Sequence, residues 1–303
     1  MSVVSELLGN FLRGLLMGGA DVIPGVSGGT VALIVGIYER LIRSIRVGAS
    51  ALFDGARLDF AGSRQRFRQV EWRLVLPLGA GIATALVIGA RVIPPLLESY
   101  REPVFAVFFG LILGSVVVPL RRIERLGAPE LALIGATVVA AFLLVGLPPR
   151  ELADPPLPYV FVAAAIAICA MILPGVSGAF LLLVMGVYEP TLKAVTVLNL
   201  PYVLTFMVGA VIGLGSFARL LEWLLLRRHS VTMAALTGLM IGGVRALWPW
   251  QTEDRAVLAP TDVSSLLVMA GLAIVGFVAV ILLIRVSGTR VTPTSAAEGP
   301  TSP

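Results

Sequence analysis

A short phrase of glycine, proline and serine occurs twice in the chain and holds the groups best suited to chemistry. The pentapeptide Pro24 to Gly28 returns, residue for residue, as Pro174 to Gly178. Proline and glycine break a helix, and the apolar stretch after each serine can begin a new one with unpaired N–H groups at its start. Such a helix N-terminus carries partial positive charge and attracts anions. If the two copies meet tip to tip, their positive ends predict one shared site for an anion of about phosphate size.

The candidate binding residues are of three kinds: glycines that let a ligand approach the backbone, residues with hydroxyl donors, and charged residues. Glycine lets a ligand reach the backbone, and serine and threonine donate hydrogen bonds. Arg13 and Asp21 lie beside the first phrase, where they either pair with each other or bind the substrate and a coupling proton respectively. This set contains Arg13, Asp21, Gly25, Ser27, Gly28, Gly29, Thr30, Gly175, Ser177, Gly178 and Arg245. The structural alternative is that the glycines only permit tight helix packing, but two matching copies favour a binding site.

Four further charged residues are candidates for gating or coupling. Arg91 and Arg219 occupy equivalent places in a weaker repeat with an offset of 128, in which Gly81, Gly110 and Gly114 match Gly209, Gly238 and Gly242. They extend to the membrane interface or contact the anion. Glu39 and Glu189 each follow a tyrosine at the end of a repeated segment. Each glutamate can serve as a gate, as a proton carrier or as a structural cap.

The composition indicates an integral membrane protein. Of the 303 residues, 57% are hydrophobic and only 14% are charged, and the mean hydropathy is +0.96. A soluble domain carries far more charge. The net charge of +5 does not indicate nucleic acid, because the arginines flank apolar segments, as residues that set membrane orientation do.

The apolar segments predict an all-α polytopic fold made of two inverted-topology repeats, each a re-entrant helical hairpin plus three transmembrane helices. The hairpins are Leu7 to Ile37 and Tyr159 to Val187, because each has a second arm too short to cross a bilayer. The predicted spans are Arg73 to Leu97, Pro103 to Leu120, Ala128 to Leu147, Pro201 to Leu226, Val231 to Trp248 and Asp262 to Ile284.

The domain boundaries follow from this division. Residues 1–127 hold the first hairpin, two spans and an arginine-rich loop over 50–71, and residues 128–147 complete the first repeat. Residues 148–286 form the second repeat, and residues 287–303 read as a disordered tail. The loop over 50–71 lies on the inner leaflet or is an ordinary solvated loop.

Basic residues set the expected orientation. They are concentrated in loops that alternate along the chain, whereas the opposite loops carry only Arg101, Arg150, Lys193 and Arg255. By the positive-inside rule the arginine-rich side is cytoplasmic. We therefore expect a multi-pass protein of the plasma membrane with both termini in the cytoplasm, and two hairpins that enter from opposite faces.

Enzymatic function is not expected. The residues around Ser27 satisfy the Gly-x-Ser-x-Gly pattern of serine hydrolases, but that pattern needs a histidine partner, and the chain has only His229. One cysteine, Cys169, and one histidine cannot build a Cys/His metal site. We expect no cofactor and no metal.

The stretch from Gly19 to Thr30, with Gly36 to Glu39 after it, closely resembles bacterial polyprenyl-phosphate translocases, formerly known as a domain of unknown function. Met171 to Glu189 and Trp248 to Trp250 share the likeness. It implies a flippase that returns undecaprenyl phosphate, the lipid carrier for peptidoglycan and other wall polymers, to the inner leaflet. The resemblance adds Pro24 and Pro174 to the site residues. It also marks Ala179 as a departure, since a small hydroxyl residue is expected there.

The main rival is a channel or carrier for a small inorganic anion, which uses opposed helix ends in the same way. A cavity that opens between helices toward lipid distinguishes the lipid substrate from the ion. The expected partners are a polyprenyl phosphate lipid and the bilayer. The sequence leaves the coupling ion, the direction of net transport and the oligomeric state undetermined.

Overall fold

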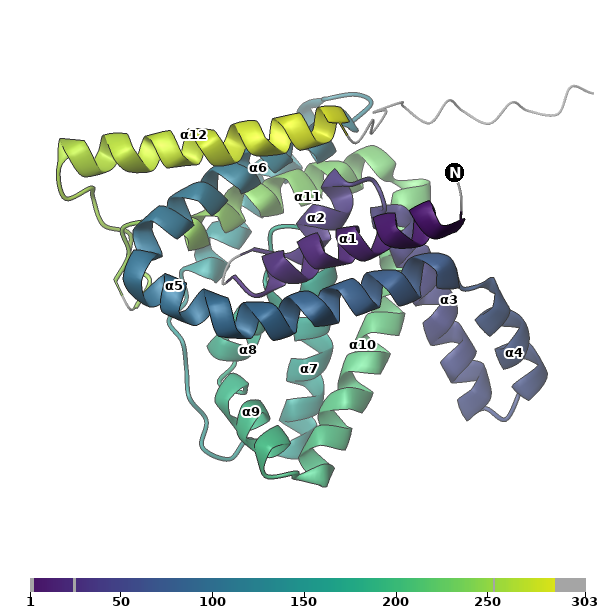
Figure 1. Cartoon of the computed structure of the whole chain (residues 1–303). Coiled ribbons are helices and arrows are strands. Elements are labelled where there is room, and N and C mark those ends of the chain that lie inside the picture. The colour runs from purple at the N-terminus through teal and green to yellow at the C-terminus, as the bar shows by residue number, and fades with distance from the viewer. Residues whose placement is uncertain (1–2, 24–25, 253, 287–303) are drawn as a thin grey trace, which may run out of the picture.

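The computed structural model describes residues 3–23, 26–252 and 254–286 of the chain, and within them the fold is helical (Figure 1). Gln251 and Val257 form an isolated β-bridge. Predictions for Pro24, Gly25 and the tail over 287–303 fall outside these residues. The elements are α1 Val3–Asp21, α2 Gly28–Ile34, α3 Tyr38–Ala56, α4 Phe60–Gln69, α5 Trp72–Arg121, α6 Ala128–Val145, α7 Leu157–Ile172, α8 Gly178–Val184, α9 Tyr188–Thr196, α10 Leu200–Arg227, α11 His229–Gly243, the 3₁₀ helix η1 Val244–Leu247 and α12 Val263–Val286.

Six described segments are long and apolar enough to cross a membrane, and they confirm the six predicted spans. These segments are Trp72–Gly89, Arg91–Arg121, Ala128–Val145, Leu200–Arg227, His229–Leu247 and Val263–Arg285. The region over 50–71, expected as a loop, is mostly helical, because α3 continues to Ala56 and α4 begins at Phe60. The chain is a multi-pass membrane protein.

Two of the spans belong to one bent helix, α5. Its backbone is non-helical at Tyr100, where φ is −139° and ψ is 40°, and Pro94, Pro95 and Pro103 lie close by. Proline removes a helical hydrogen bond and favours a kink. Figure 1 shows α5 running beside α1 and then turning toward α12. The first part of α5 therefore packs on α1, and the second part packs on α12.

The repeated phrase gives repeated local structure. Helices α2 and α8 each contain seven residues and begin after Ser27 and Ser177, whose side chains accept a hydrogen bond from the first turn. Each ends near a glycine with positive φ, 73° at Gly36 and 72° at Gly186. Glycine adopts this backbone conformation without strain. The next helices, α3 and α9, then begin at Tyr38 and Tyr188.

The weaker repeat is a repeat of close helix contacts. A Cβ atom at Gly81 of α5 would collide with the carbonyl oxygen of Phe11 in α1. A Cβ atom at Gly209 of α10 would collide with the carbonyl oxygen of Phe161 in α7 in the same way. Phe11 and Phe161 are themselves 150 positions apart. The pair α1 and α5 is therefore built like the pair α7 and α10.

The last helix of each predicted repeat packs on the other repeat. Gly110 in the second part of α5 approaches the Ala273 carbonyl of α12, and Gly238 of α11 approaches the Ile134 carbonyl of α6. The glycines leave no room for a side chain at either crossing, as is common where membrane helices pack closely. Because α6 and α12 cross over in this way, the two repeats form one packed unit around a shared core.

Candidate functional site

The two copies of the phrase touch each other at their breaks. The hydroxyl of Ser27 lies 3.3 Å from the carbonyl oxygens of Met171 and Leu173, to which it can donate. The backbone N–H of Gly175 donates to the Thr30 hydroxyl over 3.1 Å. We call this set of hydrogen bonds between residues 27–30 and 171–175 the tip contact. It brings together the candidates Ser27, Thr30 and Gly175, although the two copies are separated by about half the chain, whereas Ser177 and Gly178 are not part of it.

Tyr38 extends the tip contact. Its hydroxyl donates to the carbonyl oxygen of Ile172 over 3.0 Å, and its side chain is almost fully buried. Gly29 also lies against the Ile172 carbonyl, since a Cβ atom there would be 3.0 Å from that oxygen. The last residues of α7 therefore give successive carbonyl groups to the first copy of the phrase. These carbonyls are the orphan acceptors that any helix C-terminus leaves.

The start of α2 already has an anionic partner. The Asp21 carboxylate accepts a hydrogen bond from the Gly28 N–H over 2.6 Å, and the Ser27 hydroxyl accepts one from the Gly29 N–H over 3.2 Å. A carboxylate at a helix N-terminus is favourable because it complements the partial positive charge there. In this conformation Asp21 thus occupies the position that the sequence assigned to a substrate anion.

The second copy lacks such a carboxylate. Met171 stands where the first copy has Asp21, and the start of α8 is capped by the Ser177 hydroxyl, 3.4 Å from the Phe180 nitrogen. Pro174 and Gly175 are buried, and Gly175 has a φ of 83°. Gly178 lies against the Ala167 carbonyl of α7, where a Cβ atom does not fit. The glycines of the second copy thus serve a tight turn and close packing.

The candidate arginines bind carbonyl and amide oxygens of the protein. Arg13 donates to the Asn10 side chain over 2.7 Å rather than to Asp21. Arg245 donates to the Phe142 carbonyl over 2.9 Å and to the Arg255 carbonyl over 3.4 Å. Its guanidinium also stacks on the Phe142 ring, 4.4 Å from the centroid. Arg245 therefore ties η1 to α6 and to the segment before α12.

The gating candidates differ between the repeats. Arg219 donates to the Ser50 hydroxyl over 3.0 Å, whereas the equivalent Arg91 is exposed and has no polar contact in the described part of the chain. Glu39 forms an ion pair of 3.3 Å with Arg122, whereas Glu189 is exposed and forms none with the described residues. The two repeats thus share their local backbone structure but differ in the contacts of their charged side chains.

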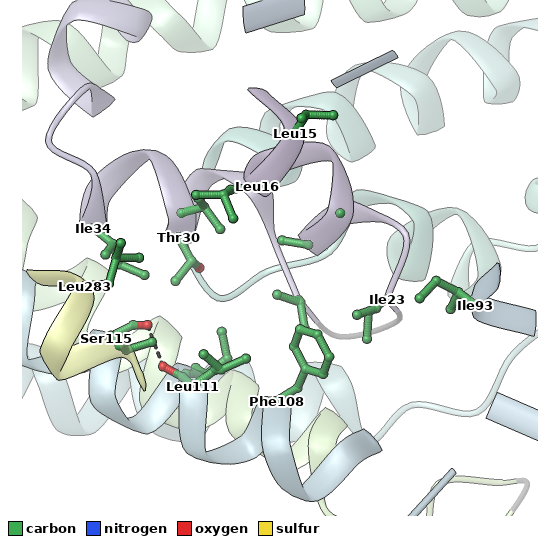
Figure 2. A pocket seen from close by; sticks show the side chains of 16 residues that line it. Leu15, Leu16, Ile23, Thr30, Ile34, Ile93, Phe108, Leu111, Ser115 and Leu283 are labelled. Atoms are coloured by element: carbon green, nitrogen blue, oxygen red, sulfur yellow. Dashed lines mark hydrogen bonds between the residues drawn. The ribbon is translucent and has the colours of Figure 1, made fainter. Parts of the chain in front are cut away.

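An apolar cavity of about 410 Å³ lies beside the first copy, between α1, α2, α5 and α12 (Figure 2). Leucine, isoleucine, valine and phenylalanine side chains dominate its lining, and Thr30 and Ser115 are its polar side chains. The Ser115 hydroxyl is satisfied by the Leu111 carbonyl at 2.6 Å. Leu16, one of the lining residues, is 49% exposed, so the cavity lies next to the apolar surface of the protein.

A second apolar cavity, of about 580 Å³, lies beside the second copy. Its lining repeats that of the first, since Leu16, Ala20 and Ile23 correspond to Ile166, Ala170 and Leu173 at the offset of 150. Leu111 corresponds to Leu239 at the offset of 128. Both cavities adjoin the tip contact, the first through Thr30 and the second through Leu173. Sequence analysis did not predict them, because apolar lining residues look like ordinary core residues.

Asn10 is a further polar residue of this region that was not among the sequence candidates. This residue is fully buried, accepts from Arg13, and donates to the Arg73 carbonyl over 2.8 Å. A polar side chain in an apolar helix is a signal that could have singled it out, since buried amides are kept where they are hydrogen-bonded. Asn10 joins the start of α5 to α1 and holds Arg13 in place.

A family model and two curated proteins match most of this chain. Residues 17–265 match the VCA0040-like family, described as undecaprenyl phosphate translocase-like. The chain is 44% identical over 245 residues to a polyprenyl-phosphate transporter of Vibrio cholerae, covering 80% of this chain and 78% of that protein. It is 27% identical over 296 residues to a polyprenyl-phosphate transporter of Staphylococcus aureus, covering 92% and 96% respectively. No solved structure is significantly similar to the chain. The chain belongs to the undecaprenyl phosphate translocase-like family.

Proposed function

We propose that this protein is a flippase that moves a polyprenyl phosphate, with undecaprenyl phosphate as the best candidate, between the leaflets of the plasma membrane. The family match and the two transporters of the same class support this function. Transport returns the lipid carrier used for peptidoglycan and other wall polymers to the cytoplasmic side. The protein acts as a transporter and not as an enzyme.

The chemistry of the substrate explains what such a protein must provide. A phosphate headgroup is charged, and charge in the hydrocarbon core is unfavourable by several kcal/mol or more. The isoprenoid tail is apolar and stays in lipid or in an apolar cavity at no such cost. The protein therefore needs a polar path for the head only, next to apolar space for the first part of the tail.

The observation that carries the proposal is the position of the tip contact between the two apolar cavities. Thr30 lines the first cavity and also accepts the Gly175 N–H, while Leu173 lines the second cavity and accepts from Ser27. A tail in either cavity places its phosphate beside the tip contact. The apolar lining of both cavities favours a lipid over a small inorganic anion, which requires a hydrated vestibule.

We further propose that the two hairpins enter the membrane from opposite faces as inverted repeats, with both termini cytoplasmic. The bend of 103° between α8 and α9 suits a re-entrant segment. The conformation described here is then a closed one, because Ser27, Thr30 and Tyr38 bond the hairpins to each other. Opening the tip contact on alternate sides releases the Ser27 and Thr30 hydroxyls and the Gly175 N–H to the passing head.

Reconstitution in liposomes tests this function. A polyprenyl phosphate with a fluorophore at the far end of its tail is not a suitable probe, because the head must be followed. A short-chain analogue with a fluorophore beside the phosphate can be quenched by a reductant that stays outside the vesicle. In vesicles without the protein, the reductant should quench about half of the fluorescence, because half of the analogue lies in the inner leaflet. In vesicles with the protein, it should quench nearly all of the fluorescence. The uncharged alcohol is the matched control for protein dependence, since it crosses without help.

A different result would contradict the proposal. The protein would be an anion carrier instead if two results occurred together. Vesicles with the protein would keep half of the fluorescent lipid protected from the reductant, and inorganic phosphate would cross the same vesicles.

A further inference from the structure

Two arginines from distant parts of the chain line one cavity of about 260 Å³. Arg101 follows the bend of α5 at Tyr100, and Arg255 lies between η1 and α12. The sequence placed both arginines in loops on the membrane face opposite the arginine-rich face, and it assigned them no binding role. The cavity is separate from the two apolar cavities, and its lining includes Gln251 and Pro149.

The two positive charges have no carboxylate partner among the described residues. Neither Arg101 nor Arg255 takes part in any of the ion pairs there. Each stacks instead on an aromatic ring, with Arg101 Cζ 5.3 Å from the Phe105 centroid and Arg255 Cζ 4.3 Å from the Phe180 centroid. A cation–π contact of this kind does not use up the N–H donors of a guanidinium, which can still bind an anion.

Electrostatics at this cavity favour an anion. Burial, and then the neighbouring positive charge of Arg101, lower the pKa of the Arg255 guanidinium from its ordinary value. The direction means that the charged form is destabilised by its surroundings. Two like charges that face one cavity repel each other, and an anion between them removes that repulsion.

The segment that carries Arg255 is held in a defined shape. Arg255 has a φ of 63°, which is uncommon for a residue other than glycine. Its N–H donates to the Thr252 carbonyl over 3.0 Å, and its carbonyl accepts from Arg245. The Gln251 side chain donates to the Trp248 carbonyl over 2.6 Å. A side chain kept in an unfavourable backbone conformation by several hydrogen bonds is typical of a functional position.

The cavity adjoins the second hairpin. The ring under Arg255 belongs to Phe180 in the first turn of α8, whose N–H is capped by Ser177. Ala246 lines the cavity and also packs with Val176 and Phe180 in one apolar cluster. A ligand held by Arg255 is therefore next to the residues of the repeated phrase.

We propose that Arg101 and Arg255 form a capture site for a phosphate monoester, the headgroup of the polyprenyl phosphate, at the outward face before the head reaches the tip contact. This inference rests on the proposed function. Arginine suits the role because its planar donors match two phosphate oxygens at once. Arg245 holds the Arg255 segment and acts as a positioning residue.

Binding to the full chain in lipid nanodiscs tests the site, with farnesyl phosphate as the probe. Arg101→Gln and Arg255→Gln should each weaken binding by about tenfold or more, the scale of one lost charge-assisted hydrogen bond. Arg150→Gln is the matched control, because Arg150 is exposed, does not line the cavity, and makes its described contact through its backbone. It should change affinity less than twofold.

Two further measurements separate the possible results. Inorganic phosphate should compete only weakly with farnesyl phosphate, and equal affinity for both would overturn the assignment to a lipid head. Arg101 is exposed, so Arg101→Gln should keep the size-exclusion profile and thermal unfolding of the original chain even if Arg255→Gln does not. Unchanged farnesyl phosphate affinity in Arg101→Gln would overturn the site.

The liposome experiment distinguishes failure of the site from failure of the function. If the original chain transports polyprenyl phosphate and Arg101→Gln binds and transports it equally well, the site is wrong and the function stands. If the original chain does not transport the lipid, but Arg101→Gln still loses farnesyl phosphate affinity, the function is wrong and the site stands.

Discussion

The backbone N–H of Gly175 donates to the side-chain oxygen of Thr30 across 3.1 Å, and this bond joins the two copies of the repeated phrase. Thr30 is 1% exposed, and Gly175 is also buried. A buried N–H without a partner is unfavourable. Losing this bond would therefore cost more free energy than the bond itself contributes to stability, because the Gly175 N–H would stay buried and unpaired. It therefore favours the closed arrangement of the hairpins.

Replacing Thr30 by valine removes this acceptor while keeping the shape of the side chain. Because the Gly175 N–H then has no described partner, we expect the free energy of unfolding to fall by about 1–3 kcal/mol. Thermal or denaturant unfolding of the purified protein in detergent measures the change. Thr205→Val is the control, since that hydroxyl bonds only to Pro201 of its own helix. Equal stability of Thr30→Val and the control would show that the tip contact does not form in solution.

The two repeat-equivalent serines allow a comparison within one molecule. Ser27 caps α2 and lies within reach of two carbonyls of the second hairpin, whereas Ser177 only caps α8. Ser177→Ala should lower stability by about 0.5–2 kcal/mol, the usual range for a lost N-cap. Ser27→Ala should lower it further and should also lower the initial rate of lipid transport. If Ser177→Ala has the larger effect on either readout, the first copy does not hold the tip contact.

The sequence was sufficient for the parts of the fold that depend on pattern. Apolar length predicted the six spans, and the exact return of Ser27 and Gly36 as Ser177 and Gly186 predicted two segments with the same local backbone. The repeat at an offset of 128 predicted that the spans are equivalent, but it did not predict why the same glycines recur. That cause is close helix contact, which places Gly81 on the Phe11 carbonyl and Gly209 on the Phe161 carbonyl.

The site could be predicted only in part, because its contacts depend on three-dimensional placement. No sequence pattern indicates that Asp21 caps α2 or that Arg13 binds Asn10, since a charged residue beside a helix end has several possible partners. Arg101 and Arg255 are far apart in the chain, and only the bend at Tyr100 and the turn after Gln251 bring them to one cavity. The crossing of α6 and α12 onto opposite repeats was likewise not encoded in any local pattern.

Close packing at Gly81 gives a third prediction, with a control on the same helix. Gly81→Ala places a methyl group against the Phe11 carbonyl and should lower the free energy of unfolding by about 1–3 kcal/mol, the usual effect of overpacking. Gly209→Ala should act similarly against Phe161. Gly79→Ala has open space around the new methyl group and should be neutral or stabilising by up to about 1 kcal/mol, because alanine favours helix. Equal destabilisation at Gly79 and Gly81 would argue against this helix packing.

The first apolar cavity can be narrowed by a substitution at Gly19, which tests its proposed use by the lipid tail. Gly19 lines this cavity, and a Cβ atom there has no neighbour within 4 Å. Gly19→Leu should therefore leave stability unchanged or slightly raised, while its side chain occupies space needed by the first isoprene units. We expect the initial rate of polyprenyl phosphate transport in liposomes to fall severalfold. Gly9→Leu is the matched control, because Gly9 also has open surroundings on α1 but does not line the cavity. Transport that is equally fast in both variants would mean that the tail crosses along the outer surface of the protein and not through this cavity.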